Sequence, residues 1–126
     1  METIKKDALH EKSFKLALRI VRLYRYLTEE KKEYILSRQV LRSGTNPGAM
    51  VREAANAESG TDFIHKLSVA QKEIGETLYW LELLYESDYL NKIEFQSLKS
   101  DSEELMKILR SSILTKKKNL SNKTSS

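Results

Sequence analysis

The 126-residue sequence contains no cysteine, one proline and four glycines. The absence of cysteine excludes a disulfide framework, a thiolate nucleophile and any metal site with cysteine ligands. The scarcity of proline and glycine, with 32% charged residues and apolar residues at helical spacing, indicates an all-α protein. The length fits one domain with a substantial core.

Long apolar segments are also missing. Residues 1–13, METIKKDALHEKS, lack the apolar stretch of a signal peptide. No run approaches the roughly 18 apolar residues that a membrane span needs. We therefore expect a cytoplasmic protein without a membrane partner.

Apolar residues recur every three or four positions through four segments, which is the pattern of amphipathic helices. The predicted helices span residues 10–29, 33–57, 60–85 and 92–115. Short connections between them predict an antiparallel, up-down-up-down four-helix bundle that forms a single domain, residues 1–115. The low apolar content of residues 116–126 predicts a disordered basic tail.

Local signals mark some helix ends and one irregularity. Ser59 and Asn91 are predicted N-caps, with acidic residues three positions later as in a capping box. Pro47 lies inside the second predicted helix, where proline removes a backbone donor and clashes with the preceding turn. The sequence therefore predicts a kink at this proline, or two shorter helices in line.

The net charge of +4 is unevenly distributed along the chain. Residues 1–25 hold seven basic and three acidic side chains, and residues 26–104 hold nine basic and fifteen acidic ones. Residues 105–126 hold six basic side chains and no acidic one. An acidic middle between basic ends fits either ordinary solvated helix faces or a surface that attracts a polyanion.

One side of the first predicted helix is strongly basic. Its cations are Lys12, Lys15, Arg19, Arg22 and Arg25, with Tyr26 on the same side. Such a surface would neutralise phosphates, and the tyrosine would stack on a base. The alternative is a solvated face that pairs with acids of a neighbouring helix or subunit. No RNA- or DNA-binding motif is present, so any recognition would be of the nucleic-acid backbone.

Catalytic and metal-binding patterns are not found. His10 and His65 lie on different predicted helices, without an H-E-x-x-H motif or a repeated E-x-x-H motif. Ser43 has no evident base, and the glutamates of the middle segment suit ion pairs better than acid–base catalysis. We expect a non-enzymatic protein that uses no cofactor and no metal.

The second predicted helix has one face of small residues, which lets neighbouring backbones come close together. Its other side is charged. Tyr79 and Trp80 are adjacent on the third predicted helix and point in different directions, so one of them is expected at an interface. The residues predicted at an oligomer or bundle interface are Arg42, Gly44, Gly48, Arg52, Glu53 and Trp80.

Two stretches resemble a known family. They are QVLRSGTNPGAMVREA at residues 39–54 and DFIHKLSVAQKEIGETLYWLELL at residues 62–84. They are similar to the bacterial four-helix-bundle protein family, also called the 23S rRNA intervening-sequence protein family. The resemblance extends over residues 13–118, and Pro47 departs from the family pattern.

The resemblance implies a four-helix bundle that assembles as a homopentamer. Some family members are encoded within insertions in 23S rRNA genes. A relative, the accessory protein of diversity-generating retroelements, is a basic pentamer that binds nucleic acid and a reverse transcriptase. The partners implied are further copies of this chain, RNA or DNA, and a protein such as a reverse transcriptase.

Together these observations predict a non-enzymatic, homo-oligomeric binding or scaffold protein that associates with nucleic acid through the basic side of its first helix. A protein-interaction module with no nucleic-acid role is the alternative.

Overall fold

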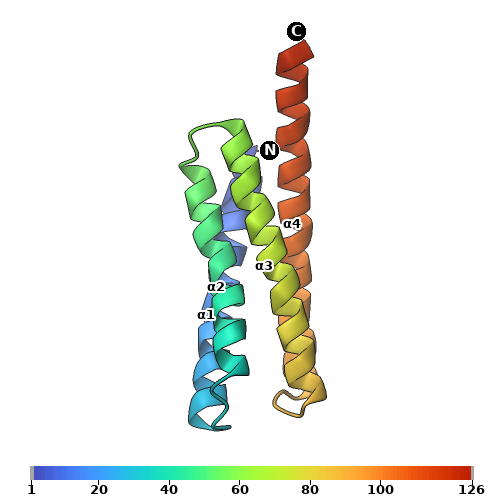
Figure 1. The fold of residues 1–126 in the computed structure, drawn as a ribbon. Coiled ribbons are helices and arrows are strands. Elements are labelled where there is room, and N and C mark those ends of the chain that lie inside the picture. Colours follow the sequence, from blue (N-terminus) through green and yellow to red (C-terminus); the bar gives the residue numbers. More distant parts are fainter. Residues whose placement is uncertain (1, 126) are drawn as a thin grey trace.

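The computed structural model describes the backbone of residues 2–125 and the side chains of residues 8–122. Its helices are α1 (Glu2–Glu29), α2 (Leu36–Ala55), α3 (Gly60–Glu86) and α4 (Lys92–Ser125). Figure 1 shows them running side by side, with each helix antiparallel to the one before it. α1 and α3 each pack against both α2 and α4, so the helices surround one core. The predicted four-helix bundle is confirmed.

The core is formed by one line of apolar side chains from each helix. Its fully buried large members include Leu16, Ile20, Leu67, Leu81, Leu98 and Leu105. Two apolar residues whose spacing fits the apolar sides of their helices lie outside this core: Phe14 is 51% exposed and Ile93 is 82% exposed. Periodicity places a residue within a broad sector of a helix, but it does not show where the neighbouring helices end.

Two helices are longer than the sequence indicates. α1 begins at Glu2 rather than near residue 10, and α4 continues to Ser125 rather than ending at 115. Neither proline nor glycine occurs within residues 92–126, so neither of these residues interrupts α4. Leu120 packs on Gly60, where an added Cβ would lie 2.7 Å from the leucine side chain. The expected disordered tail is therefore helical through Ser125, and Figure 1 shows α4 extending beyond the other helices.

The predicted caps of α3 and α4 are confirmed. The backbone N–H of Asp62 donates to Ser59 Oγ at 3.0 Å, and that of Glu94 donates to Asn91 Oδ1 at 2.8 Å. Each bond satisfies a donor that a helix start leaves without an intrahelical partner.

The group that caps the start of α2 was not predicted from the sequence. The Glu33 carboxylate accepts the backbone N–H groups of Ile35, Leu36 and Ser37 at 2.8–3.0 Å. A carboxylate at this end also interacts favourably with the helix dipole. Glu33 therefore lies before α2 as its cap, whereas the sequence pattern placed it inside the helix.

Pro47 does not divide the second helix. α2 is continuous from Leu36 to Ala55, and Pro47 is buried within it. The proline removes one hydrogen bond of the helix. The packing of α2 against both α1 and α3 offsets this loss, and the alternative of two shorter helices is wrong.

Candidate nucleic-acid interface

The basic side of α1 borders α4, and acidic residues of α4 engage two of its cations. Lys12 Nζ lies 2.7 Å from Glu104 Oε1. The Arg19 guanidinium lies 2.8 Å from Asp101 Oδ2 and 3.2 Å from Glu94 Oε1. The hydrogen bond to Glu104, together with the charge of that carboxylate, raises the pKa of Lys12 above its usual value. For these two cations the alternative of pairing with a neighbouring helix is confirmed.

The remaining cations of α1 face solvent. Lys15, Arg22 and Arg25 are exposed, and none forms an ion pair with a described side chain. Helical geometry explains the division, because each residue is rotated by about 100° from the one before. This rotation brings Lys12 and Arg19 to the carboxylates of α4 and leaves the other three nearer to solvent. The candidate phosphate-binding set is therefore smaller than the sequence suggests.

A groove opens beside this surface, where α1 passes the start of α4. Its cavity volume is about 400 Å³, within the range of small-molecule sites. It is lined by Arg19, Arg22, Leu23, Tyr26, Leu90, Asn91 and Glu94. Leu23 and Leu90 are nearly buried and supply the apolar part of the lining, whereas Tyr26 is 41% exposed.

Some polar side chains of the groove already have a hydrogen-bond or ion-pair partner, and one cation has no carboxylate partner among the described side chains. Glu94 pairs with Arg19, and Asn91 caps α4 through its side-chain oxygen. Arg22 is left as the groove's cation without a carboxylate among the described side chains. Sequence reasoning found Arg22 and Tyr26 but missed Leu90 and Glu94, because their proximity depends on how α4 packs against α1.

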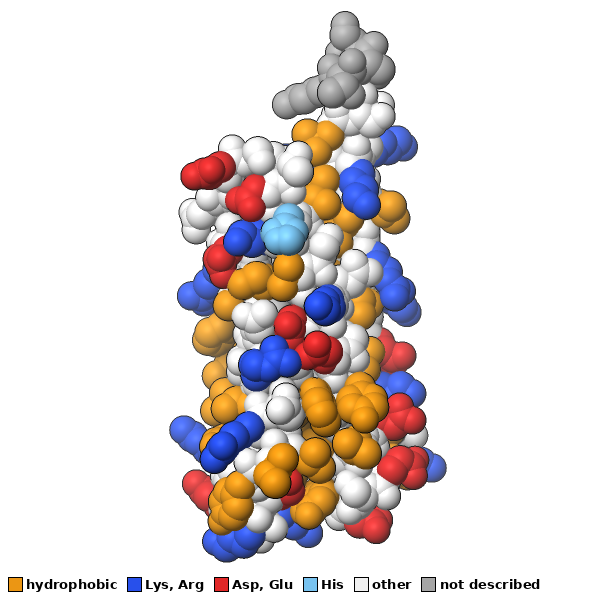
Figure 2. All heavy atoms as spheres, viewed as in Figure 1, with side chains coloured by type: hydrophobic (Ala, Val, Ile, Leu, Met, Phe, Trp, Pro, Cys, Tyr) orange, Lys and Arg blue, Asp and Glu red, His pale blue; other side chains and the backbone are white. Residues whose placement is uncertain are grey.

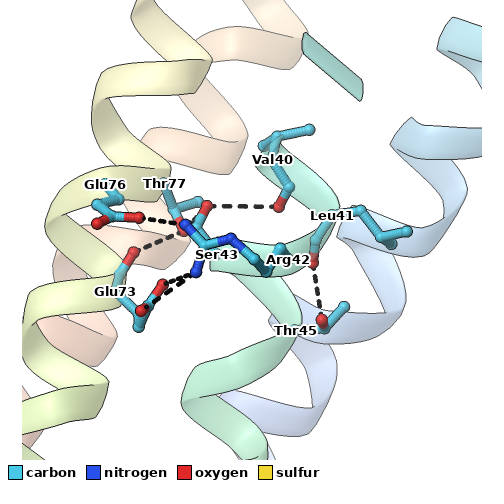
Figure 3. Close-up of polar contacts among 8 residues, drawn as sticks. All are labelled: Val40, Leu41, Arg42, Ser43, Thr45, Glu73, Glu76 and Thr77. Carbon is cyan, nitrogen blue, oxygen red and sulfur yellow. Dashed lines mark hydrogen bonds and ion pairs between the residues drawn. The ribbon is translucent and has the colours of Figure 1, made fainter. Parts of the chain in front are cut away.

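The residues predicted at an interface mostly make contacts within the chain. Arg42 of α2 reaches two carboxylates of α3, at 2.7 Å to Glu76 and 3.3 Å to Glu73 (Figure 3). The hydrogen bond to Glu76, followed by the charge of Glu73, raises the pKa of Arg42. Beside this cluster Thr77 donates to Ser43 Oγ at 3.0 Å in the buried space between the helices. Arg42 therefore stabilises the packing of α2 on α3.

Glu53, Gly44 and Gly48 also make contacts between helices of the same chain. Glu53 pairs with Lys66 of α3 at 3.3 Å. At Gly44 an added Cβ would lie 2.6 Å from Ile20 Cγ1, and at Gly48 it would lie 3.5 Å from the carbonyl oxygen of Ser13. The face of small residues thus lets α1 and α2 approach closely, as the sequence predicts.

Arg52 makes no ion pair with a described side chain. Its guanidinium lies over the ring of Phe14, 5.5 Å from the centroid, and so covers part of this exposed aromatic side chain.

Trp80 and its neighbour differ in exposure. Tyr79 is 57% exposed and Trp80 is half-buried, with their rings edge to face at 4.9 Å. The indole Nε1 of Trp80 is buried and has no hydrogen-bond partner among the described residues. Tyr34 and Ile35 are exposed as well. Figure 2 shows apolar side chains gathered on the lower half of the face formed by α2 and α3.

Two structural features are absent from the described part of the chain. Its His, Asp and Glu side chains form no group of three or more that could hold a metal ion. No helix in it combines the length and the apolar character that crossing a membrane requires.

Comparison with known proteins identifies the family of this chain. The model of the family described as 23S rRNA-intervening sequence protein matches residues 5–111. The chain belongs to this family. The resemblance seen in the sequence is confirmed, and the last turns of α4 lie beyond the matched region.

One similar solved structure is the crystal structure, at 1.70 Å resolution, of a protein with unknown function from the S23 ribosomal protein family of Bacteroides thetaiotaomicron VPI-5482. It is 48% identical, with a TM-score of 0.86, and the match covers 86% of this chain and 97% of that one. No curated protein matches the chain.

Proposed function

We propose that this chain is a non-enzymatic, homo-oligomeric binding protein that holds nucleic acid by its backbone, through Lys15, Arg22 and Arg25 of α1. One observation carries the proposal. Among the cations of the basic side of α1, these three are exposed and are not engaged by carboxylates of the described residues. Desolvating an unpaired cation against a phosphate breaks no existing ion pair, and it releases the counterions that drive such binding.

Self-assembly supports this role. The family resemblance implies a pentamer, and each added subunit would contribute another set of three cations. A nucleic acid that contacts several such sets binds more tightly than one that contacts a single set. After the first contact, the remaining sets meet the nucleic acid at a high effective concentration. We propose ribosomal RNA or a protein–nucleic-acid complex, such as one that contains a reverse transcriptase, as the partner, in the cytoplasm.

The test reverses the unpaired charges. Arg22→Glu with Arg25→Glu should abolish binding of a fluorescent RNA, measured by anisotropy across a salt series. If each chain neutralises about three phosphates, the wild-type slope of log K against log salt should be about −2 per bound subunit for a single strand. Arg19 is left intact because a glutamate there would face Glu94 and Asp101.

The matched control is Lys107→Glu with Arg110→Glu. Both residues are exposed on α4 and make no ion pair with a described side chain. The control changes the net charge equally and should retain binding. Light scattering on the same samples should give a mass near five times the 14.6-kDa chain. Equal losses in both variants would show that net charge, rather than the α1 surface, holds the RNA.

The alternative, a protein-interaction module, is favoured by a different observation. Tyr34, Ile35 and Tyr79 are 51%, 74% and 57% exposed, and aromatic and aliphatic side chains of this kind are typical of protein interfaces. A defined oligomer that binds no RNA or duplex DNA at low salt would favour this function.

A further inference from the structure

We infer that the groove between α1 and the start of α4 takes one unstacked base of a single-stranded nucleic acid, with the adjoining phosphates on Arg22 and its exposed neighbours. This inference rests on the proposed function and makes it more specific. It names the form of nucleic acid, and it assigns Tyr26 a role that charge alone does not provide.

The positions of Tyr26 and Arg22 favour such an occupant. The two residues are four apart on α1, so their side chains lie on one side of the helix, separated by about 6 Å of axial rise. Both line the groove, together with the nearly buried Leu23 and Leu90. A half-exposed ring beside an apolar recess suits the flat, weakly polar face of a base. Arg22, about one helical turn from Tyr26, is placed to bind the phosphate of the same nucleotide.

The surroundings of the groove disfavour a duplex. Glu94, Asp101 and Glu104 of α4 follow α1 along one side, although each pairs with a cation. A rigid duplex carries one charge per about 1.7 Å of its axis, and its phosphates could not avoid these carboxylates along the length of α1. Bases inside a duplex are also stacked and cannot reach a tyrosine ring. A flexible single strand can turn one base into the groove and direct its phosphates toward Lys15, Arg22 and Arg25.

Stacking of this kind is tolerant of sequence, because every base has a π-face. We therefore expect discrimination between single and double strands, with little preference among bases.

The experiment compares an oligouridine of about 12 nucleotides, a length within the range of single-strand binding sites, with an RNA duplex of equal length. The wild type should bind the single strand more tightly. Tyr26→Ala should weaken single-strand binding about tenfold and leave duplex binding unchanged, because one base–aromatic stack is lost. Tyr26→Phe keeps the ring and should behave as the wild type does.

Leu114→Ala is the control, since Leu114 is a large side chain that is 66% exposed on α4, twenty residues beyond Glu94. It should bind both ligands normally. A second measurement does not depend on the folding of any variant: a single strand with 2-aminopurine at a central position should lose fluorescence when it binds the wild type, because the base stacks.

The outcomes separate the two proposals. If the 2-aminopurine strand binds without losing fluorescence, the inference is overturned but backbone binding remains. The same holds if the wild type binds single-stranded and duplex RNA with equal affinity. Single-strand binding by Tyr26→Ala equal to that of the wild type overturns it too. Failure of the wild type to bind any RNA at low salt overturns the proposed function and this inference together.

Discussion

The two sides of α1 pack by different physical means. Toward α2 the contact is close and largely apolar, with Ile20 against Gly44 and the backbone of Ser13 near Gly48. Toward α4 it relies on Lys12 and Arg19, which reach across to carboxylates, and it leaves a groove of about 400 Å³. Close packing tolerates little change in side-chain volume, whereas exposed ion pairs contribute only about 0–1 kcal/mol each. The α2 side is therefore the more closely packed of the two, and the α4 side leaves open the space and charge that the proposed binding would use.

The largest expected effect comes from filling the α1–α2 contact. Gly44→Val would place side-chain atoms where an ideal Cβ already lies 2.6 Å from the fully buried Ile20. We expect it to lower the free energy of unfolding by about 1–3 kcal/mol, the usual cost of overpacking. Urea unfolding followed by circular dichroism measures this change.

Gly75→Ala is the control for that substitution. A Cβ at Gly75 meets no atom within 4 Å, so it should stabilise α3 by roughly 0.5–1 kcal/mol. If Gly44→Val and Gly75→Ala changed the free energy of unfolding equally, the contact between α1 and α2 at Gly44 would not be sterically restricted.

A smaller effect is expected from removing an ion pair on the α4 side. Arg19→Ala deletes two charged hydrogen bonds from a side chain that is 20% exposed, and it should cost about 1 kcal/mol. The loss should shrink in 1 M salt, since screening weakens the pairs in the wild type. Lys15→Ala, at an exposed and unpaired position, should leave stability unchanged. A cost at Arg19 that is unaffected by salt would point to packing of its aliphatic stem instead.

The smallest effect should be a pH dependence at Lys12. Its pKa is raised above 10.5 in the folded chain by Glu104, so the pair stabilises the fold below about pH 10.5 and is lost as pH rises through the folded value. The small difference in melting temperature between the wild type and Lys12→Met should therefore be constant near neutral pH and should vanish in strong alkali. A difference that grows with pH would contradict this pairing.

Features that depend on neighbouring residues in the chain were predictable. The caps at Ser59 and Asn91 and the apolar periodicity of the helices follow from local chemistry, and both agree with the structure. The end of α4 was missed because Leu120 finds its contact at Gly60, which is far away in sequence.

The candidate site was only partly predictable for a related reason. Arg19 and Arg22 are the same residue type one turn apart, and nothing in their local sequence distinguishes them. Only the position of α4 makes one a partner of Glu94 and Asp101 and leaves the other exposed beside the groove. The aspartate and glutamates in the middle of α4, which no helix-end effect accounts for, were the available signal of this pairing.

The close approach at Gly44 has a further consequence for the rotation of α1 about its own axis. Ile20 fits against a position that lacks a side chain, so α1 has one rotational setting at which it can approach α2 this closely. That setting alone decides which cations turn toward α4 and which toward solvent. A rotation of α1 about its axis would change which cations face the α4 carboxylates without altering one basic side chain. The surface that α1 presents thus depends on packing at the opposite side of the helix, which includes a glycine that no ligand bound at the basic surface would touch.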